Sequence, residues 1–247
     1  MSNDVQLSIW EHLDELRSRL LKAALALIIG TAISLIFAER ALQVLILPLG
    51  DKVPQTIHPT ESFTVYFRVA LIGGVTLAMP VIVYQVVRYM LPGLLTQEKK
   101  YLYSLLPGVA VCFTSGVAFA ALIMLPAAIN FLQSFMHTII DNRWTLDNYI
   151  SFVTQVMFWM GIVFQTPLLM FFLAKLNLVT AKKLASFRKY AIVAIAVIAA
   201  AVTPTPDPIN MMIVMVPLVL LYEVGVILAR VAVAGRKPAE TNPTGAS

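Results

Sequence analysis

Long apolar runs separated by short polar segments make up most of this chain. A helix needs roughly 20 apolar residues to cross the hydrocarbon core of a membrane. Six runs meet or approach that length, at residues 20–38, 63–87, 101–125, 148–174, 190–202 and 209–229. The pattern predicts an all-α, polytopic membrane protein with six transmembrane helices.

The fifth run, residues 190–202, is shorter than an ordinary membrane span. Thirteen residues rise only about 20 Å, against a hydrocarbon core of roughly 30 Å. Prolines and an acidic residue in the segment 203–208 then prevent the helix from continuing. We therefore expect short fifth and sixth helices, a concave, cupped scaffold, and a turn at 203–208 drawn towards membrane depth.

The distribution of Lys and Arg predicts the orientation. Cytoplasmic loops of membrane proteins are enriched in these residues. Fourteen of the 18 lie beside the ends of the predicted spans that share one side of the membrane with both termini. We predict cytoplasmic termini, external loops at 39–62, 126–147 and 203–208, and a location in the inner (cytoplasmic) membrane.

Composition supports a membrane protein of one domain. The chain is 59% hydrophobic and 13% charged, and its net charge of +5 follows from the membrane topology rather than from nucleic-acid binding. Residues 1–236 are predicted to form a single transmembrane domain. Residues 237–247 are predicted to form a polar, disordered tail.

An amphipathic helix is predicted before the first span. Its apolar positions have helical spacing and are interpreted as packing: Trp10, Leu13, Leu16 and Leu20. Its polar side carries Glu11, Asp14, Glu15, Arg17 and Arg19. Glu15 and Arg19 are four residues apart, a spacing that permits an ion pair worth a few tenths of a kcal/mol.

Three polar residues near the later spans are candidate sites. Gln165 lies midway along the fourth run, where Pro167 is expected to kink the helix, and either an interhelical hydrogen bond or a hydrated contact is open to it. Glu223 lies about two turns before Arg230 in the sixth run. Asp207 precedes Pro208, so capping of the sixth helix is its simplest role.

Enzymatic chemistry has little support in the sequence. The three histidines, His12, His58 and His137, lie outside the predicted spans, which argues against a serine–histidine pair within the membrane. Cys112 has no partner for a disulfide or a cysteine metal site, and no metalloprotease or nucleotide-binding motif occurs. We predict no enzyme, no metal and no cofactor. A receptor platform and a small-molecule or ion secondary transporter both remain open.

Several motifs resemble one protein family. Residues 12–20, His-Leu-Asp-Glu-Leu-Arg-Ser-Arg-Leu, resemble the HLxELRxRL signature at the start of TatC proteins. Residues 80–85 and 92–100 resemble the first cytoplasmic loop of that family. Further similarity covers 161–167, 185–190, 203–207 and 217–223, so only the tail after about Arg236 lies outside the resemblance.

The resemblance implies a receptor for folded precursors that carry a twin-arginine signal peptide. Such a receptor works with TatA-type and TatB-type single-span partners, in an oligomeric complex driven by the protonmotive force. Glu15 and Glu98 match the two cytoplasmic glutamates that read the arginine pair, and Arg17 lies in the same signature. Tyr89 stands where the family usually has phenylalanine, and Val87 replaces a usual tryptophan.

The chemistry of carboxylates agrees with this implied role. A guanidinium pairs bidentately with a carboxylate, and lysine is a poorer substitute at such a site. Glu98 also falls near the start of the third span, where the helix dipole alone favours a carboxylate.

One departure from the family concerns the fourth span. Gln165 stands where many members have a glutamate, and an amide does not titrate. We therefore expect a polar, hydrated spot on the concave face, with thinning of the membrane and contact with a partner helix as the two roles open to it, and Glu223 as a second intramembrane candidate. Asp207 matches the acidic residue of the last external loop.

Overall fold

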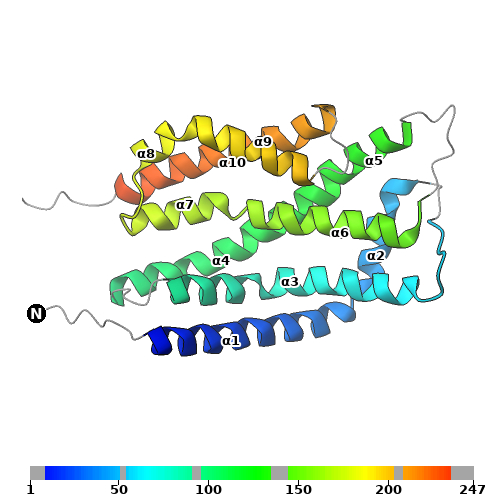
Figure 1. Cartoon of the computed structure of the whole chain (residues 1–247), viewed down its shortest axis with the longest axis horizontal. Coiled ribbons are helices and arrows are strands. Elements are labelled where there is room, and N and C mark those ends of the chain that lie inside the picture. Colours follow the sequence, from blue (N-terminus) through cyan, green and yellow to red (C-terminus); the bar gives the residue numbers. More distant parts are fainter. Residues whose placement is uncertain (1–8, 51–53, 91–95, 135–143, 203–207, 235–247) are drawn as a thin grey trace, which may run out of the picture.

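The computed structural model describes residues 9–50, 54–90, 96–134, 144–202 and 208–234 (Figure 1). Within them the chain is helical, apart from short turns and one bridge between Gln55 and Thr145. The helices are α1 (Ile9–Leu35), α2 (Ala38–Ile46), α3 (Glu61–Met90), α4 (Thr96–Phe119), α5 (Leu125–Ser134), α6 (Leu146–Val163), α7 (Thr166–Lys175), α8 (Ala181–Ser186), α9 (Arg188–Val202) and α10 (Pro208–Ala234). The prediction of an all-α fold is confirmed.

Five helical stretches are long and apolar enough to cross a membrane. They are Trp10–Leu35, Glu61–Tyr89, Leu105–Ser134, Leu146–Lys175 and Met211–Ala232. The remaining predicted span corresponds to α9, whose 15 residues rise about 22 Å. A sixth crossing by this helix stays a prediction.

The sixth predicted helix is longer than expected. α10 has 27 residues, because nothing between Arg230 and Ala234 interrupts the helix. The prediction of a short sixth helix is therefore wrong, and only α9 is short.

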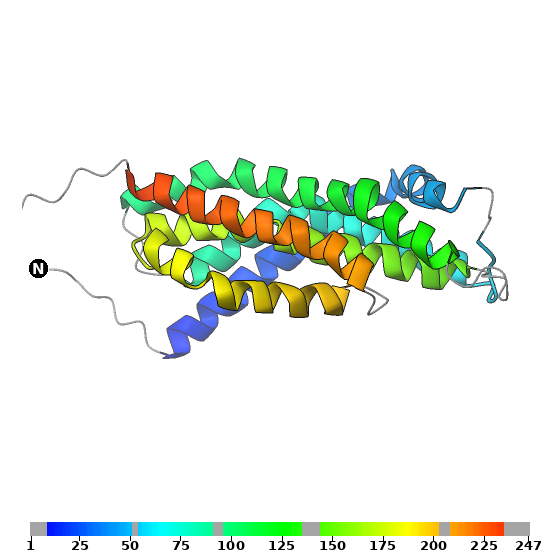
Figure 2. The same ribbon diagram turned by 90° about the horizontal axis from the view of Figure 1, so that it is seen from above.

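The helices form an uneven bundle. In Figure 1, α1 lies along one edge beside α3, α6 and α7 follow, and α9 and α10 form the opposite edge. We call the end where α1 begins and α10 ends the terminal end. The last residues of α9 and the first of α10 lie short of the opposite end, which α5 and the start of α6 reach (Figures 1 and 2). This arrangement agrees with the predicted lopsided scaffold, and its cupped shape in a membrane stays a prediction.

Helix α6 is the centre of the packing. Tyr149, Val153, Val156 and Met160 are completely buried at helical spacing along it. The Tyr149 hydroxyl donates a 2.6 Å hydrogen bond to the carbonyl oxygen of Leu45, at the end of α2. This bond satisfies a buried polar group and attaches α2, which lies in the predicted loop 39–62, to the core.

Two predicted boundaries near the N-terminal half are wrong. The amphipathic helix and the first span form one continuous helix, α1, rather than two elements. The third run also continues beyond 125, through a π-helical segment Ala120–Met124 into α5. Pro126 lacks an amide hydrogen and crowds the carbonyl four residues earlier, which explains a local widening of the helix without a break.

The apolar stripe of α1 does not pack as predicted. Trp10 and Leu20 are 78% and 66% exposed, and Leu13 and Leu16 are also exposed. These side chains face outward because α1 contacts the rest of the chain mainly through α3.

Small residues bring α1 and α3 into close contact. A methyl group added at Gly30 would lie 2.6 Å from the carbonyl oxygen of Gly74. A methyl group added at Gly74 would lie 2.6 Å from the backbone nitrogen and Cα of Thr31. Backbones approach this closely in membrane helix pairs only where side chains are absent or small.

Replacing Gly74 with alanine should therefore destabilise the protein, because the new methyl group meets backbone atoms that yield only if α1 moves. We expect the free energy of unfolding in detergent to fall by about 1–3 kcal/mol. Gly108→Ala is the matched control, since its methyl group meets only the flexible tip of Leu168 at 3.3 Å. Equal stability of the two variants would contradict the close α1–α3 contact.

Candidate functional site

Glu15 is held in place across the α1–α3 interface. Its Oε1 atom accepts hydrogen bonds from Arg19 Nε at 3.3 Å and Nη2 at 3.0 Å. Arg19 Nη1 donates in turn to Gln85 Oε1 on α3, at 3.2 Å. The predicted pairing of Glu15 with Arg19 is confirmed, and Gln85 fixes it to the neighbouring helix.

The second carboxylate oxygen of Glu15 is available to a ligand. In the described part of the chain, no group donates a hydrogen bond to Oε2. The Glu15 side chain is 23% exposed and that of Arg19 is 14% exposed, so the pair is partly shielded from solvent. One oxygen is thus oriented by the protein while the other can accept a charge-assisted hydrogen bond.

An aromatic pair lies one helical turn before Glu15. The rings of His12 and Tyr89 stack with centroids 4.6 Å apart and planes 11° apart. Tyr89 comes from the end of α3, so this contact also joins α1 to α3 at the terminal end. The structure therefore places Tyr89 near the Glu15 network, and its role in peptide binding stays a prediction.

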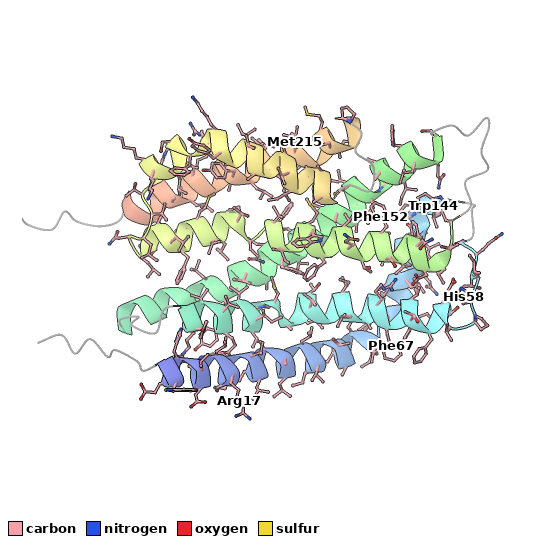
Figure 3. All side chains as sticks on the ribbon, viewed as in Figure 1. Arg17, His58, Phe67, Trp144, Phe152 and Met215 are labelled. Atoms are coloured by element: carbon pink, nitrogen blue, oxygen red, sulfur yellow. The ribbon has the colours of Figure 1, made fainter. Side chains whose placement is uncertain are left out.

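Arg17 lies on a different face of α1. Its side chain is exposed and points away from the other helices (Figure 3). It borders a shallow surface hollow with Asp14 and Lys22. The structure does not bring Arg17 together with Glu15 and Tyr89, because residues two apart lie on nearly opposite sides of a helix.

The backbone places Glu98 at the same end of the bundle. It lies in the first turn of α4, whose start is at the terminal end, as are the start of α1 and the end of α3 (Figure 1). The side chain of Glu98 and the whole of Asp207 lie outside the described residues.

Gln165 sits at a break in the fourth predicted span. α6 ends at Val163 and α7 begins at Thr166, because Pro167 cannot donate the hydrogen bond that would continue the helix. Gln165 Nε2 donates to the carbonyl oxygen of Val109 on α4, at 2.9 Å. The expected interhelical hydrogen bond and the expected kink are both confirmed.

The amide oxygen of Gln165 lacks a hydrogen-bond donor among the residues that the structure describes. Oε1 is buried and accepts no hydrogen bond from the described residues. A buried acceptor left unpaired in this way carries a free-energy penalty until a water or a partner group reaches it. Gln165 is therefore a candidate for contact with a water molecule or with a partner protein.

Glu223 is engaged by the neighbouring helix. Arg188 at the start of α9 forms a bidentate pair with it, with Nε and Nη2 each 2.7 Å from a carboxylate oxygen. The pair is substantially exposed, and it links the start of α9 to the middle of α10 rather than lying deep in the bundle. A role for Glu223 in contacting a partner protein stays a prediction.

Sequence reasoning missed Gln85 and His12 as parts of the site. Gln85 carried a usable signal, because a polar side chain near the end of an apolar span tends to face another protein group. His12 carried a weaker one, since ring stacking with Tyr89 depends on how two distant helices meet. Within the described ranges, no cluster of three His, Cys, Asp or Glu residues has a geometry for holding a metal ion.

The fold and site together define a helical membrane protein with a partly shielded carboxylate at one end of its bundle. Residues 11–217 match the family model described as Sec-independent protein translocase protein (TatC). The chain belongs to the TatC family, and it is a component of a protein translocase, with no enzymatic role. Family membership removes the reason for considering a secondary transporter.

Proteins from distant organisms share this similarity over nearly the whole chain. The TatC protein of Aquifex aeolicus is 36% identical over 233 residues, covering 92% of this chain and 96% of the relative. That of Carboxydothermus hydrogenoformans is 32% identical, covering 92% and 94% respectively. A crystal structure of the twin-arginine translocase receptor TatC matches with a TM-score of 0.75 and 36% identity, covering 90% of this chain and 99% of that one.

The Arg188–Glu223 pair should contribute little to stability. Both side chains are more than a third exposed, at 44% and 38%, and water that reaches the start of α9 at the membrane surface would screen their attraction. A double-mutant cycle with Arg188→Gln and Glu223→Gln should give a coupling energy of about 0.2–1 kcal/mol in thermal unfolding. A coupling above about 2 kcal/mol would instead place the pair in a low-dielectric environment.

Proposed function

We propose that this chain is the receptor subunit that binds twin-arginine signal peptides of folded precursors. The proposal rests on the carboxylate of Glu15. Its Oε1 atom is held by Arg19, and its Oε2 atom accepts no hydrogen bond from the described residues. A client guanidinium hydrogen-bonds the open oxygen without displacing Arg19.

The arginine pair needs a second acceptor, and Glu98 supplies it. Its position in the first turn of α4, at the same end as Glu15, supports this assignment. The stacked His12–Tyr89 pair adds an aromatic surface beside Glu15, on which a planar guanidinium can pack. Arg17 faces the membrane surface and contributes positive charge rather than a direct contact.

The proposed orientation places the terminal end in the cytoplasm of a cell with an inner membrane, with α9 as a sixth, short crossing. Arg19, Arg88, Lys175 and Arg230 all belong to helix ends that gather there, which supports this orientation. The receptor assembles with further copies of itself and with TatA-type and TatB-type single-span proteins. The protonmotive force drives export, and Gln165, Glu223 and Asp207 are candidate sites for contacts along that route.

Site-specific photo-crosslinking to a twin-arginine peptide tests the two acceptors. Glu15→Gln and Glu98→Gln remove the negative charge with little change of shape, so each should lower the crosslinking yield about tenfold or more, which corresponds to about 1.4 kcal/mol. Asp14→Asn is the matched control, because Asp14 adjoins Glu15 in sequence but borders the outward hollow near Arg17. Wild-type yield from both glutamate variants would refute the proposal.

Gln165 should affect transport of the precursor rather than binding of the signal peptide. Gln165→Leu removes the hydrogen bond to Val109 and the unpaired acceptor, so we expect slower transport of a precursor with unchanged peptide crosslinking. Thr166→Ala at the adjacent, half-buried position serves as the control. Loss of peptide binding with normal transport is the opposite pattern and would exclude this role.

A further inference from the structure

An apolar groove lies where α8, α9 and α10 meet at the terminal end. It has a volume of about 390 Å³, and its lining residues are Val179, Lys183, Leu184, Phe187, Tyr190, Ala191, Ala194 and Tyr222. The Tyr222 hydroxyl donates a 2.8 Å hydrogen bond to the carbonyl oxygen of Leu184, which fixes α8 against α10. The groove therefore has defined walls.

Positive charge lies beside the groove. Lys183 lines it, and Lys182, Arg188 and Lys189 are close to its lining residues along α8 and the start of α9. Within the described residues, Glu223 is the acid paired with this cluster, and it is taken by Arg188. Lys182, Lys183 and Lys189 form no ion pair in that part of the chain.

The apolar wall continues along the outer face of α9. Val193 and Val197 are 63% and 65% exposed, and Tyr190 at the mouth is 70% exposed. A ligand that pairs with the basic residues and also covers the apolar wall has an anionic head and a long apolar tail. Basic pockets between membrane helices bind anionic lipid headgroups in this way.

We propose that the groove binds an anionic phospholipid. The phosphate lies at Lys182 and Lys183, and one acyl chain follows the groove past Ala194 onto α9. The assignment does not depend on how the protein reads its clients, because Glu15 and Tyr89 are on other helices. Bound lipid would hold the start of α9 at the membrane surface. This matters because a helix of only 15 residues is short for a membrane span.

Native mass spectrometry of the full chain in detergent tests the proposal. Equal amounts of phosphatidylglycerol and phosphatidylcholine are added to delipidated protein, and bound lipid is counted. We expect phosphatidylglycerol to be retained about tenfold more than phosphatidylcholine. Inorganic phosphate at the same concentration should not displace it, because phosphate lacks the acyl chain.

Two variants separate the headgroup from the tail. Lys182→Gln with Lys183→Gln should abolish the preference for phosphatidylglycerol, and Ala194→Phe should reduce binding of both lipids by filling the groove. Lys22→Gln removes a basic residue from α1 and should leave retention unchanged. Equal retention of the two lipids by the wild-type chain, displacement by inorganic phosphate, or unaltered retention in both groove variants would overturn the proposal. Unaltered retention in both groove variants would indicate that a partner helix, and not a lipid, occupies the groove.

Discussion

The close approach of α1 to α3 is the contact on which the candidate site depends. Gly30 and Gly74 leave no side chain between the two backbones, so the helices meet at a distance that larger residues would prevent. Glu15, Arg19 and His12 lie on α1, while Gln85 and Tyr89 lie on α3. A shift between these helices would break the Arg19–Gln85 hydrogen bond and the His12–Tyr89 stacking, the two contacts that join α1 to α3 at the site.

The rest of the bundle supplies a rigid support for that contact. α3 packs against the buried helix α6, whose Tyr149 and Met160 are fully enclosed. On the far side of α6 the structure becomes shorter, because α9 has only 15 residues. The protein thus combines a firm edge, which carries the proposed peptide site, with a shorter edge, where the bilayer is predicted to thin.

The features predicted correctly from the sequence are mainly local. Apolar runs predict helices because lipid leaves no other way to satisfy the backbone, and Pro167 predicts a break because it lacks an amide hydrogen. Glu15 and Arg19 are neighbours on one helix, so their spacing predicts their pairing. Family motifs added Glu98 and Tyr89 as candidates, and their roles stay predictions.

The errors concern contacts between distant segments and the points where helices end. The apolar stripe that includes Trp10 and Leu20 is buried only if other helices pack on that side of α1. The periodicity of the sequence does not show which helices surround α1. The apolar run 209–229 stops before Arg230, yet α10 continues to Ala234, because a charged residue at a membrane surface does not stop a helix. Gln85 became part of the site only through the register of α1 against α3.

The central claim is that an oriented carboxylate at this interface distinguishes arginine from other cations. The most direct measurement is the affinity of the purified chain for a signal peptide containing Arg-Arg, compared with the same peptide containing Lys-Lys. A planar guanidinium matches a carboxylate better than a point charge does, so the account predicts at least about tenfold tighter binding of the Arg-Arg peptide. Equal affinity for the two peptides would contradict it.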